Sequence, residues 1–292
     1  MTGPVADPVD TTTARELWQH TAAAVASRHE ARWLVEVAIG ADRDEFDAAL
    51  DEPVTERMVA HLDAMVARYR TGEPLAYVLG RWSFRHVELA VDRRVLIPRP
   101  ETELVAGVAI ELAAAVGPPR QVADLGTGSG AIGLALATEL PRAGTTVWLT
   151  DASADALDVA RANLAGIGRA ATNVRVAHGE WFAALPAGER FDVIVSNPPY
   201  VAEGSADLAA DVREWEPAGA LFAGPDGLAD IRTLVAGARD WLAADGWLVL
   251  EIGHDQGAAV GDLLASAGYR DAEILPDLAG HDRIARARAG AG

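Results

Sequence analysis

The chain of 292 residues contains neither cysteine nor lysine. Without cysteine it can form no disulfide bond and no thiolate metal site. Its 25 arginines stand against 43 acidic residues, which gives a formal net charge of −18. Because binding to a phosphate backbone requires a clustered basic surface, this balance argues against nucleic acid as a direct partner.

Long apolar runs are also absent, since the stretches rich in Ala and Leu are interrupted by Arg, Asp and Glu. None approaches the roughly 20 residues that a membrane-spanning helix needs. Residues 1–7 have neither the basic start nor the apolar segment of a secretion signal. We therefore expect a cytoplasmic monomer with no membrane partner. His254 and His281 lack partners at metal-binding spacing, so no metal site is expected.

The first part of the chain shows only helical periodicity. Apolar residues recur at helical spacing within residues 12–70, which indicates a small all-helical domain of several short helices. We expect Pro53 in the first turn of one of them. From Pro74 the pattern changes, because the alternating residues 81–91 predict a β-hairpin. The prolines in residues 97–100 predict a stiff loop, followed by a helix over 101–116.

Beyond Pro119 strand-like and helix-like segments alternate, which is typical of an α/β fold with a parallel sheet covered on both faces. The last two strand-like segments have no helix between them and predict an antiparallel hairpin at the sheet edge. The predicted strands are residues 122–125, 146–150, 174–177, 191–196, 247–252, 269–275 and 283–287. The predicted helices are residues 131–139, 154–165, 227–244 and 256–267.

A glycine-rich turn joins the first of these strands to its helix. The turn consists of Gly126, Thr127, Gly128, Ser129 and Gly130. Glycine lets backbone approach a ligand closely, and a helix N-terminus offers free N–H groups. Gly128, Gly130 and Gly133 also satisfy the spacing of a dinucleotide site, so a nicotinamide or flavin enzyme stays open at this point. Asp151, which ends the second strand, could accept from ribose hydroxyls in either class or cap the next helix, a role open to Ser153 as well.

The predicted strand 191–196 leads into Asn197-Pro198-Pro199-Tyr200. This places the tetrapeptide beyond the carboxyl ends of the strands, where open α/β sheets bind ligands. Two prolines fix φ and supply no N–H donor, so the Asn197 amide oxygen and the Pro198 carbonyl form a rigid pair of acceptors. Such a pair suits a planar NH₂ group, for which Tyr200 offers a stacking surface. Holding both hydrogens stabilises the charge that develops as the nitrogen is methylated. The alternative is a proline-rich turn without a ligand.

With these motifs, the sequence resembles the protein-glutamine methyltransferases that modify peptide-chain release factors. The resemblance covers nearly the whole chain and rests on residues 74–77, 96–103, 124–132, 196–200 and 280–283. Its most specific part is Ile-Pro-Arg-Pro-Glu-Thr-Glu at 97–103, joined to a helical N-terminal domain. It implies a class I, Rossmann-like methyltransferase fold with a mostly parallel seven-stranded sheet. It also implies S-adenosylmethionine as the cofactor and release factors as partners, methylated on the glutamine of their Gly-Gly-Gln motif.

The resemblance also implies roles for individual residues. The turn from Gly126 to Gly130 would line the methionine part of the cofactor, and Asp151 would hold its ribose. Trp181 would pack against the adenine, or serve only as core. Glu180 stands where the family usually has Asp, and would accept from the adenine amino group.

On the substrate side, Asn197 would lie between cofactor and substrate. The residues that would bind the glutamine are Asn197, Pro198, Pro199 and Tyr200, with Asn197, Pro198 and Tyr200 catalytic. Arg99 would line the substrate cleft or serve only as structure. The implied division is a helical substrate-recognition domain over 1–73, a hairpin linker over 74–98 and a methyltransferase domain over 99–292.

Four alternatives remain at this point. A nucleic-acid adenine methyltransferase would share the tetrapeptide but would need a basic cleft and a target-recognition segment. A glutamine methyltransferase acting on a ribosomal protein would share the catalytic domain but usually lacks the Pro-Glu-Thr-Glu continuation at 100–103. A nicotinamide-dependent oxidoreductase explains the glycine turn but not Asn197 to Tyr200. A non-catalytic binding module ranks last, because none of the motifs looks degraded.

Overall fold

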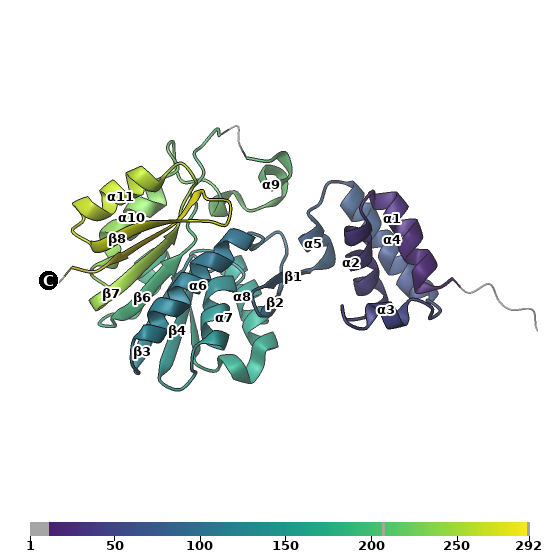
Figure 1. Ribbon diagram of the computed structural model, residues 1–292, viewed down its shortest axis with the longest axis horizontal. Helices are drawn as coiled ribbons and strands as arrows, with labels where there is room; N and C mark the ends of the chain where they lie inside the picture. The colour runs from purple at the N-terminus through teal and green to yellow at the C-terminus, as the bar shows by residue number, and fades with distance from the viewer. Residues whose placement is uncertain (1–11, 206–207, 291–292) are drawn as a thin grey trace, which may run out of the picture. The chain divides into compact units, whose positions relative to one another are not determined.

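The structure is a computed structural model that describes residues 12–205 and 208–290. The prediction about a secretion signal concerns residues 1–7, which lie outside this part. The chain forms two compact units, one ending at Gly80 and the other beginning at Arg81 (Figure 1). The predicted division at 73 and 98 into recognition, linker and catalytic parts is a functional one, and it stays a prediction.

The first unit is helical. Its helices are α1 (Ala14–Val25), α2 (Arg28–Ile39), α3 (Phe46–Ala49), α4 (Glu56–Arg70) and α5 (Leu75–Leu79). Leu34, Phe46 and Leu62 are almost fully buried in one core that these helices share. Trp18 packs its ring edge-on against Phe46, with the centroids 5.6 Å apart. The apolar stripes seen in the sequence therefore face each other in a small helical core.

The expected place of Pro53 is wrong. Helix α4 begins at Glu56, after Thr55, whose hydroxyl accepts a hydrogen bond from the Met58 N–H at 3.3 Å. Threonine can cap a helix in this way and proline cannot, so the helix starts at the threonine. Pro53 instead forms an isolated antiparallel bridge with Thr13.

The second unit is an α/β fold with one small and one large sheet. Its strands are β1 (Arg81–Phe84), β2 (Val87–Ala90), β3 (Arg120–Leu125), β4 (Thr145–Asp151), β5 (Val174–His178), β6 (Phe191–Ser196), β7 (Leu242–Glu251), β8 (Arg270–Pro276) and β9 (Asp282–Arg288). The first two form the predicted hairpin. The other seven form one sheet in the order β5-β4-β3-β6-β7-β9-β8. It is parallel from β5 to β7 and antiparallel at β9 and β8, so the predicted fold class with its edge hairpin is confirmed.

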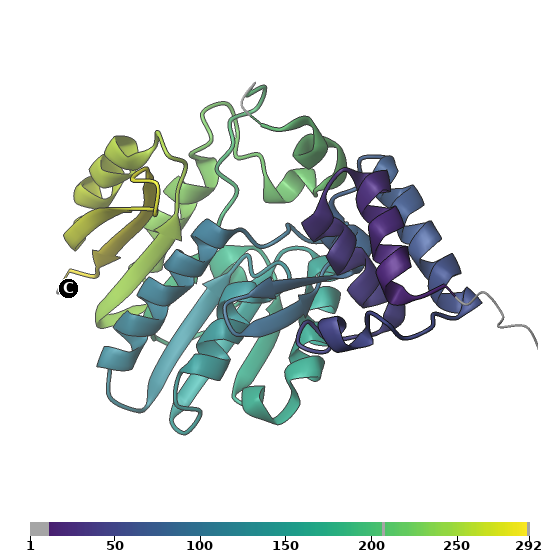
Figure 2. The ribbon, with the colours of Figure 1, turned by 45° about the vertical axis from the view of Figure 1, so that its right-hand side comes forward.

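Helices cover both faces of the large sheet. They are α6 (Pro100–Ala115), α7 (Ala131–Glu139), α8 (Ala154–Ile167), α10 (Ala229–Ala238) and α11 (Gly257–Ser266), whereas the short helix α9 (Ala210–Trp215) lies in the segment between β6 and α10. Ala123, Ile194 and Leu248 form one buried face together with residues of α10 and α11. On the opposite face α6 and α7 lie in front of the central strands (Figure 2). Within the described residues no helix is both long and apolar enough to cross a lipid bilayer.

Two predicted boundaries need correction. Residues 75–79 of the predicted hairpin linker are helical. The predicted helix 227–244 is too long, because α10 ends at Ala238 and β7 already begins at Leu242. Leu242 pairs with Phe191 across an irregularity in the β6–β7 ladder, and the Phe191 N–H donates to the Trp241 carbonyl at 2.8 Å. Pairing with another strand thus overrides the helical pattern of the sequence.

Asn163 of α8 joins three parts of the second unit and is only 6% exposed. Its Oδ1 accepts from the Ala90 N–H at 2.7 Å, and its Nδ2 donates to the Ala90 carbonyl at 3.0 Å. The same Nδ2 donates to the Ser129 carbonyl at 2.8 Å. The hairpin strand β2 and the glycine turn are therefore held by one amide.

Asn163→Ala should lower the free energy of unfolding by roughly 2–4 kcal/mol, because it leaves buried backbone groups without partners. The midpoint and slope of urea unfolding measure this loss. Arg161→Ala, on the exposed side of the same helix, is the control and should change stability by no more than about 0.5 kcal/mol. Equal losses in the two variants would contradict the role given to Asn163.

Candidate active site

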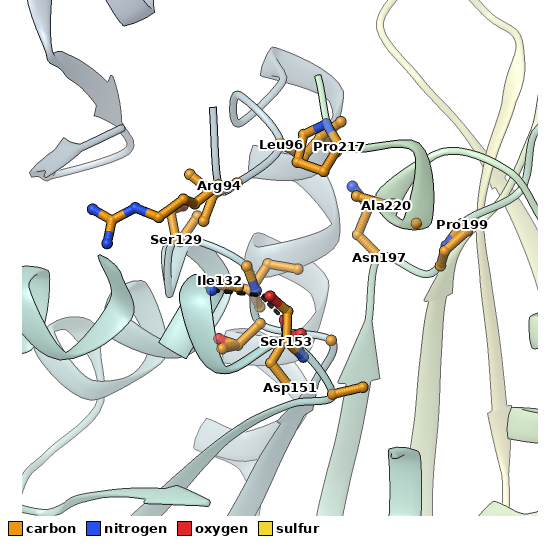
Figure 3. Close-up of a pocket in the computed structure, with 18 of the residues that line it drawn as sticks. Arg94, Leu96, Ser129, Ile132, Asp151, Ser153, Asn197, Pro199, Pro217 and Ala220 are labelled. Carbon is orange, nitrogen blue, oxygen red and sulfur yellow. Dashed lines mark hydrogen bonds between the residues drawn. The ribbon is translucent and has the colours of Figure 1, made fainter. Parts of the chain in front are cut away.

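A cleft of about 800 Å³ opens in the second unit, where the carboxyl ends of β3, β4 and β6 meet. Asn197 and Asp151 lie on different sides of it (Figure 3). The lining residues are Arg94, Val95, Leu96, Pro98, Thr102, Gly126, Thr127, Gly128, Ser129, Ala131, Ile132, Asp151, Ala152, Ser153, Ala156, His178, Gly179, Glu180, Trp181, Asn197, Pro199, Pro217, Gly219, Ala220 and Asp230. Its size and mixed lining are those of a small-molecule site.

The glycine turn forms the floor of the cleft next to the start of α7. Gly126 has a φ of +70°, in the left-handed region that favours glycine. A Cβ at this position would also lie 3.2 Å from the ring of Trp181. The Thr127 N–H donates to the Thr150 carbonyl at 2.9 Å, which ties the turn to β4. Backbone and aromatic ring thus meet here because residue 126 has no side chain.

A buried carboxyl group lies beneath this turn. Asp124 accepts on Oδ2 from the Thr127 hydroxyl at 2.5 Å and from the Gly133 N–H at 2.8 Å. Its Oδ1 has no hydrogen-bond partner among the described residues. Burial raises the pKa of Asp124 to about 7, with a smaller contribution from the charge of Asp151. Asp124 therefore holds the turn at an electrostatic cost.

Asp151 fixes the other side of the turn. Its Oδ2 accepts from the Gly128 N–H at 2.9 Å, and its Oδ1 accepts from the Ser153 N–H at 2.8 Å. The helix cap is Ser153, whose hydroxyl accepts from the Ala156 N–H at 3.1 Å. The alternative reading of Asp151 as the cap is therefore wrong. Each carboxylate oxygen keeps a further acceptor site, so Asp151 can still bind hydroxyl groups in the cleft.

Trp181 and Glu180 lie together at the start of a short 3₁₀ helix, η2 (Trp181–Ala184). Trp181 has a φ of +43°, a strained value for a residue other than glycine. Its indole N–H donates to the carboxyl group of Asp230, whose pKa is raised by burial. Trp181 also packs against the core of the second unit. It is thus both a core residue and a wall of the cleft, whereas Glu180 is exposed at the rim.

The tetrapeptide from Asn197 to Tyr200 is anchored at both ends. The hydroxyl of Ser196, the last residue of β6, donates to the Leu125 carbonyl at 2.6 Å. The Tyr200 carbonyl accepts from the side chain of Gln256 at 3.0 Å. Asn197 lines the cleft, and its Nδ2 donates to the Thr102 hydroxyl oxygen at 3.3 Å. The backbone around Asn197 is therefore held on both sides.

Tyr200, for which stacking on the substrate is expected, is half-buried, and its hydroxyl group is bound within the protein. That hydroxyl donates to Oε1 of Glu251 at 3.1 Å. Burial, and then the charge of Glu251, keep the pKa of Tyr200 well above its ordinary value. Burial likewise raises the pKa of Glu251. Among the described residues that line the cleft, Pro199 is present but Tyr200, the buried Pro198 and Gly130 are not.

Arg99 forms an ion pair with Glu216, which also accepts from the Ile97 N–H at 3.1 Å. Glu216 is nearly buried, and Arg99 is not among the described residues that line the cleft. Arg99 therefore helps to hold the loop before α6, and its expected role in lining a substrate cleft stays a prediction. Of the expected site residues, those that line the cleft are Gly126, Thr127, Gly128, Ser129, Asp151, Glu180, Trp181, Asn197 and Pro199.

Several residues of the site carry no obvious signal in the sequence. Thr102 lies inside the motif at 97–103, but only the fold places its hydroxyl next to Asn197. Glu251 ends an apolar strand, and the single acidic residue at that strand end is the only sequence signal that it borders the site. The loop at Pro217 to Ala220 and Asp230 come to the cleft from distant parts of the chain. No group of three or more metal-ligating side chains occurs within the described residues.

Asp124→Asn should remove a pH dependence of stability. The raised pKa means that the native state binds the proton more tightly than the unfolded chain, whose value is near 3.8. The contribution of Asp124 is therefore fully present below about pH 4 and is lost as the pH rises to about 7, with a slope of at most about 1.4 kcal/mol per pH unit. Urea unfolding of both proteins at about pH 5 and about pH 8 measures this. The variant should gain stability relative to the parent at the higher pH, and a constant difference would contradict the shift.

Two family models match the chain. Residues 16–80 match the PrmC N-terminal domain, and residues 109–215 match the methyltransferase small domain. Among solved structures, a methyltransferase from Pyrococcus furiosus is 17% identical with a TM-score of 0.51, covering 77% of this chain and 98% of that one. That likeness concerns the fold alone.

Curated relatives match over most of their length. The release factor glutamine methyltransferase of Burkholderia pseudomallei is 44% identical over 262 residues, which cover 89% of this chain and 91% of the relative. That of Escherichia coli is 36% identical over 274 residues, 94% of this chain and 96% of the relative. The resemblance seen in the sequence is thus confirmed, and the oxidoreductase and binding-module alternatives are excluded. The chain belongs to the family of release factor glutamine methyltransferases.

Proposed function

We propose that this protein transfers a methyl group from S-adenosylmethionine to the side-chain amide nitrogen of the glutamine in the Gly-Gly-Gln motif of class-one release factors. The observation that carries the proposal is the orientation of Asn197. Its NH₂ group is turned to Thr102, so its Oδ1 is the atom left to accept a hydrogen bond in the cleft. An acceptor, rather than a donor, is what recognition of a substrate NH₂ requires.

The residues of the cleft fit S-adenosylmethionine on the other side. The missing side chain at Gly126 leaves backbone against the ring of Trp181, and Asp151 offers carboxylate oxygens beside the start of α7. Carboxylates at this strand end accept from ribose hydroxyls in related folds. Asp151 would hold the ribose, Trp181 and Glu180 the adenine, and the turn from Gly126 to Gly130 the methionine part. When bound, the cofactor supplies a methyl group on a sulfonium centre.

The work of the protein on the substrate is positional. An amide nitrogen is a weak nucleophile, because its lone pair is delocalised into the carbonyl group. Asn197 Oδ1 and the Pro198 carbonyl would accept its two hydrogens, which turns the nitrogen toward the cofactor side of the cleft and stabilises the developing positive charge. The proton released afterwards can pass to solvent. Tyr200 would support the tetrapeptide through Glu251 and not through stacking on the substrate.

We further propose that the helical unit, residues 1–73 of the predicted division, grips the release factor. Two observations support this: residues 16–80 match the PrmC N-terminal domain, and the alignment with the release factor glutamine methyltransferase of Burkholderia pseudomallei covers 89% of this chain. The protein would act as a monomer in the cytoplasm, without direct contact to nucleic acid or membrane. The ribosomal-protein and adenine-methylating alternatives differ from this proposal in substrate.

A transfer assay with isotope-labelled S-adenosylmethionine and purified release factors tests the function directly. We expect label on the parent factor and none on a factor whose Gly-Gly-Gln glutamine is changed to alanine. Ribosomal proteins and adenine-containing oligonucleotides should remain unlabelled under the same conditions. Label on the changed factor, or on either alternative substrate in place of the release factor, would refute the proposal.

Asn197→Ala should separate transfer from cofactor binding. We expect transfer to fall by roughly 10²–10³-fold, the effect of losing one charge-stabilising contact. The dissociation constant for S-adenosylmethionine should stay within about tenfold, or ~1.4 kcal/mol, by calorimetry. Asp151→Ala is the counterpart, with cofactor binding weakened by roughly ten- to a hundredfold through loss of a charged acceptor. Asn197 would be a cofactor-retaining residue if its variant lost cofactor binding altogether.

A further inference from the structure

Glu251 is a buried carboxylate at the end of β7, with 1% of its surface exposed. Two hydroxyl groups meet it. The Thr102 hydroxyl donates to its Oε2 at 2.6 Å, and the Tyr200 hydroxyl donates to its Oε1 at 3.1 Å. Thr102 in turn receives the hydrogen bond from the Asn197 amide. A continuous chain therefore runs from Glu251 through Thr102 to the residue that faces the substrate.

We propose that Glu251 and Thr102 are positioning residues that set which way round the Asn197 side-chain amide lies, so that its oxygen faces the substrate nitrogen. This rests on the proposed function of Asn197 as the acceptor for that nitrogen. Neither residue touches the reacting atoms in this scheme. Both act through Asn197.

The number of protons on Thr102 decides the orientation of the Asn197 amide. A hydroxyl group has one proton to donate, and while Glu251 is ionised that of Thr102 is committed to its Oε2 at the short distance of 2.6 Å. The Thr102 oxygen can then only accept from Asn197. If the amide were turned over, Asn197 Oδ1 would face the Thr102 oxygen with no proton between them. That arrangement sets two acceptor oxygens against each other, one of them the buried Thr102 oxygen, and is disfavoured.

Glu251 also acts on the other end of the tetrapeptide. Its second oxygen holds the Tyr200 hydroxyl, while its first oxygen orders Thr102 and hence Asn197. One carboxylate thus fixes the first and the last residue of the tetrapeptide at once. Thr102 is 3% exposed and belongs to the first turn of α6, so its side chain has little room to find another partner.

Thr102→Val and Thr102→Ser test the proposal. Valine has nearly the shape of threonine but neither donates nor accepts, whereas serine keeps the hydroxyl group. In Thr102→Val we expect kcat to fall roughly ten- to a hundredfold, as when the outer partner of a ligand is removed at metal sites. The KM for the release factor and the affinity for S-adenosylmethionine should change little. Thr102→Ser should keep kcat close to the parent value.

Thr138→Val is the matched control. Thr138 is a half-buried threonine of α7 whose hydroxyl donates to the Leu134 carbonyl, outside the chain from Glu251 to Asn197. It should leave kcat unchanged. Urea unfolding shows whether Thr102→Val is folded. If it is not, Thr102→Ala removes the same hydroxyl group with a better helix former and gives the same comparison.

A second measurement needs neither substrate nor cofactor. In isotope-labelled protein, the side-chain amide signal of Asn197 is identified by its loss in Asn197→Ala. We expect this nuclear magnetic resonance signal to shift and broaden in Thr102→Val and to stay near its parent position in Thr102→Ser, since only the hydroxyl holds the amide.

The outcomes separate the two proposals. If the parent protein does not methylate release factors, the proposed function fails, while the amide signal still reports on Asn197. If the parent methylates them and Thr102→Val keeps its kcat, or if the valine and serine variants lose it equally, the positioning role is overturned. An Asn197 signal unchanged by valine would overturn it as well.

Discussion

The in-register pairing of the parallel strands is the constraint on which the site depends. Leu125, the last residue of β3, pairs with Thr150 of β4. The residues that follow these two, Gly126 and Asp151, therefore lie side by side. Residues paired in this way point to the same side of the sheet. The Gly128 N–H can then reach the Asp151 carboxylate although the two are distant in sequence. A slip of one residue in β4 would turn Asp151 to the opposite face and leave the glycine turn without this acceptor.

The same rule operates between β6 and β7, where sequence reasoning was incomplete. Ser196 pairs with Leu250, which puts Asn197 next to Glu251. The place of Asn197 follows from its own strand and the prolines after it, so it can be predicted from the sequence. That of Glu251 depends on which strand pairs with β6 and in what register, and Thr102 depends further on how α6 packs on that face. Strand pairing and helix packing both depend on distant parts of the chain. The sequence therefore indicates Asn197, the proposed acceptor, but not Glu251 and Thr102, which we propose to orient it.

The fold was predictable to the extent that it is encoded locally. Strands covered on both faces read as continuous apolar runs, and their helices begin at capping residues or glycine turns, so their order and type follow from the sequence. The boundary between α10 and β7 did not follow, because Leu242 becomes a strand residue by pairing with Phe191 across an irregular ladder. The helix start predicted at Pro53 was also wrong, because a better capping residue, Thr55, follows it and begins α4.

Two carboxyl groups, Asp124 of β3 and Glu251 of β7, are buried, and burial raises the pKa of both. Apolar residues at these positions would avoid the desolvation penalty, so stability alone does not account for them. Each instead receives donors from residues that line or border the cleft: Asp124 from Thr127, and Glu251 from Thr102. Asp124 orders the turn on the proposed cofactor side, and Glu251 orders the tetrapeptide on the proposed substrate side. A reaction that depends on holding an unreactive nitrogen in one orientation requires rigid acceptors, and rigid acceptors require buried partners that cost the fold some of its stability.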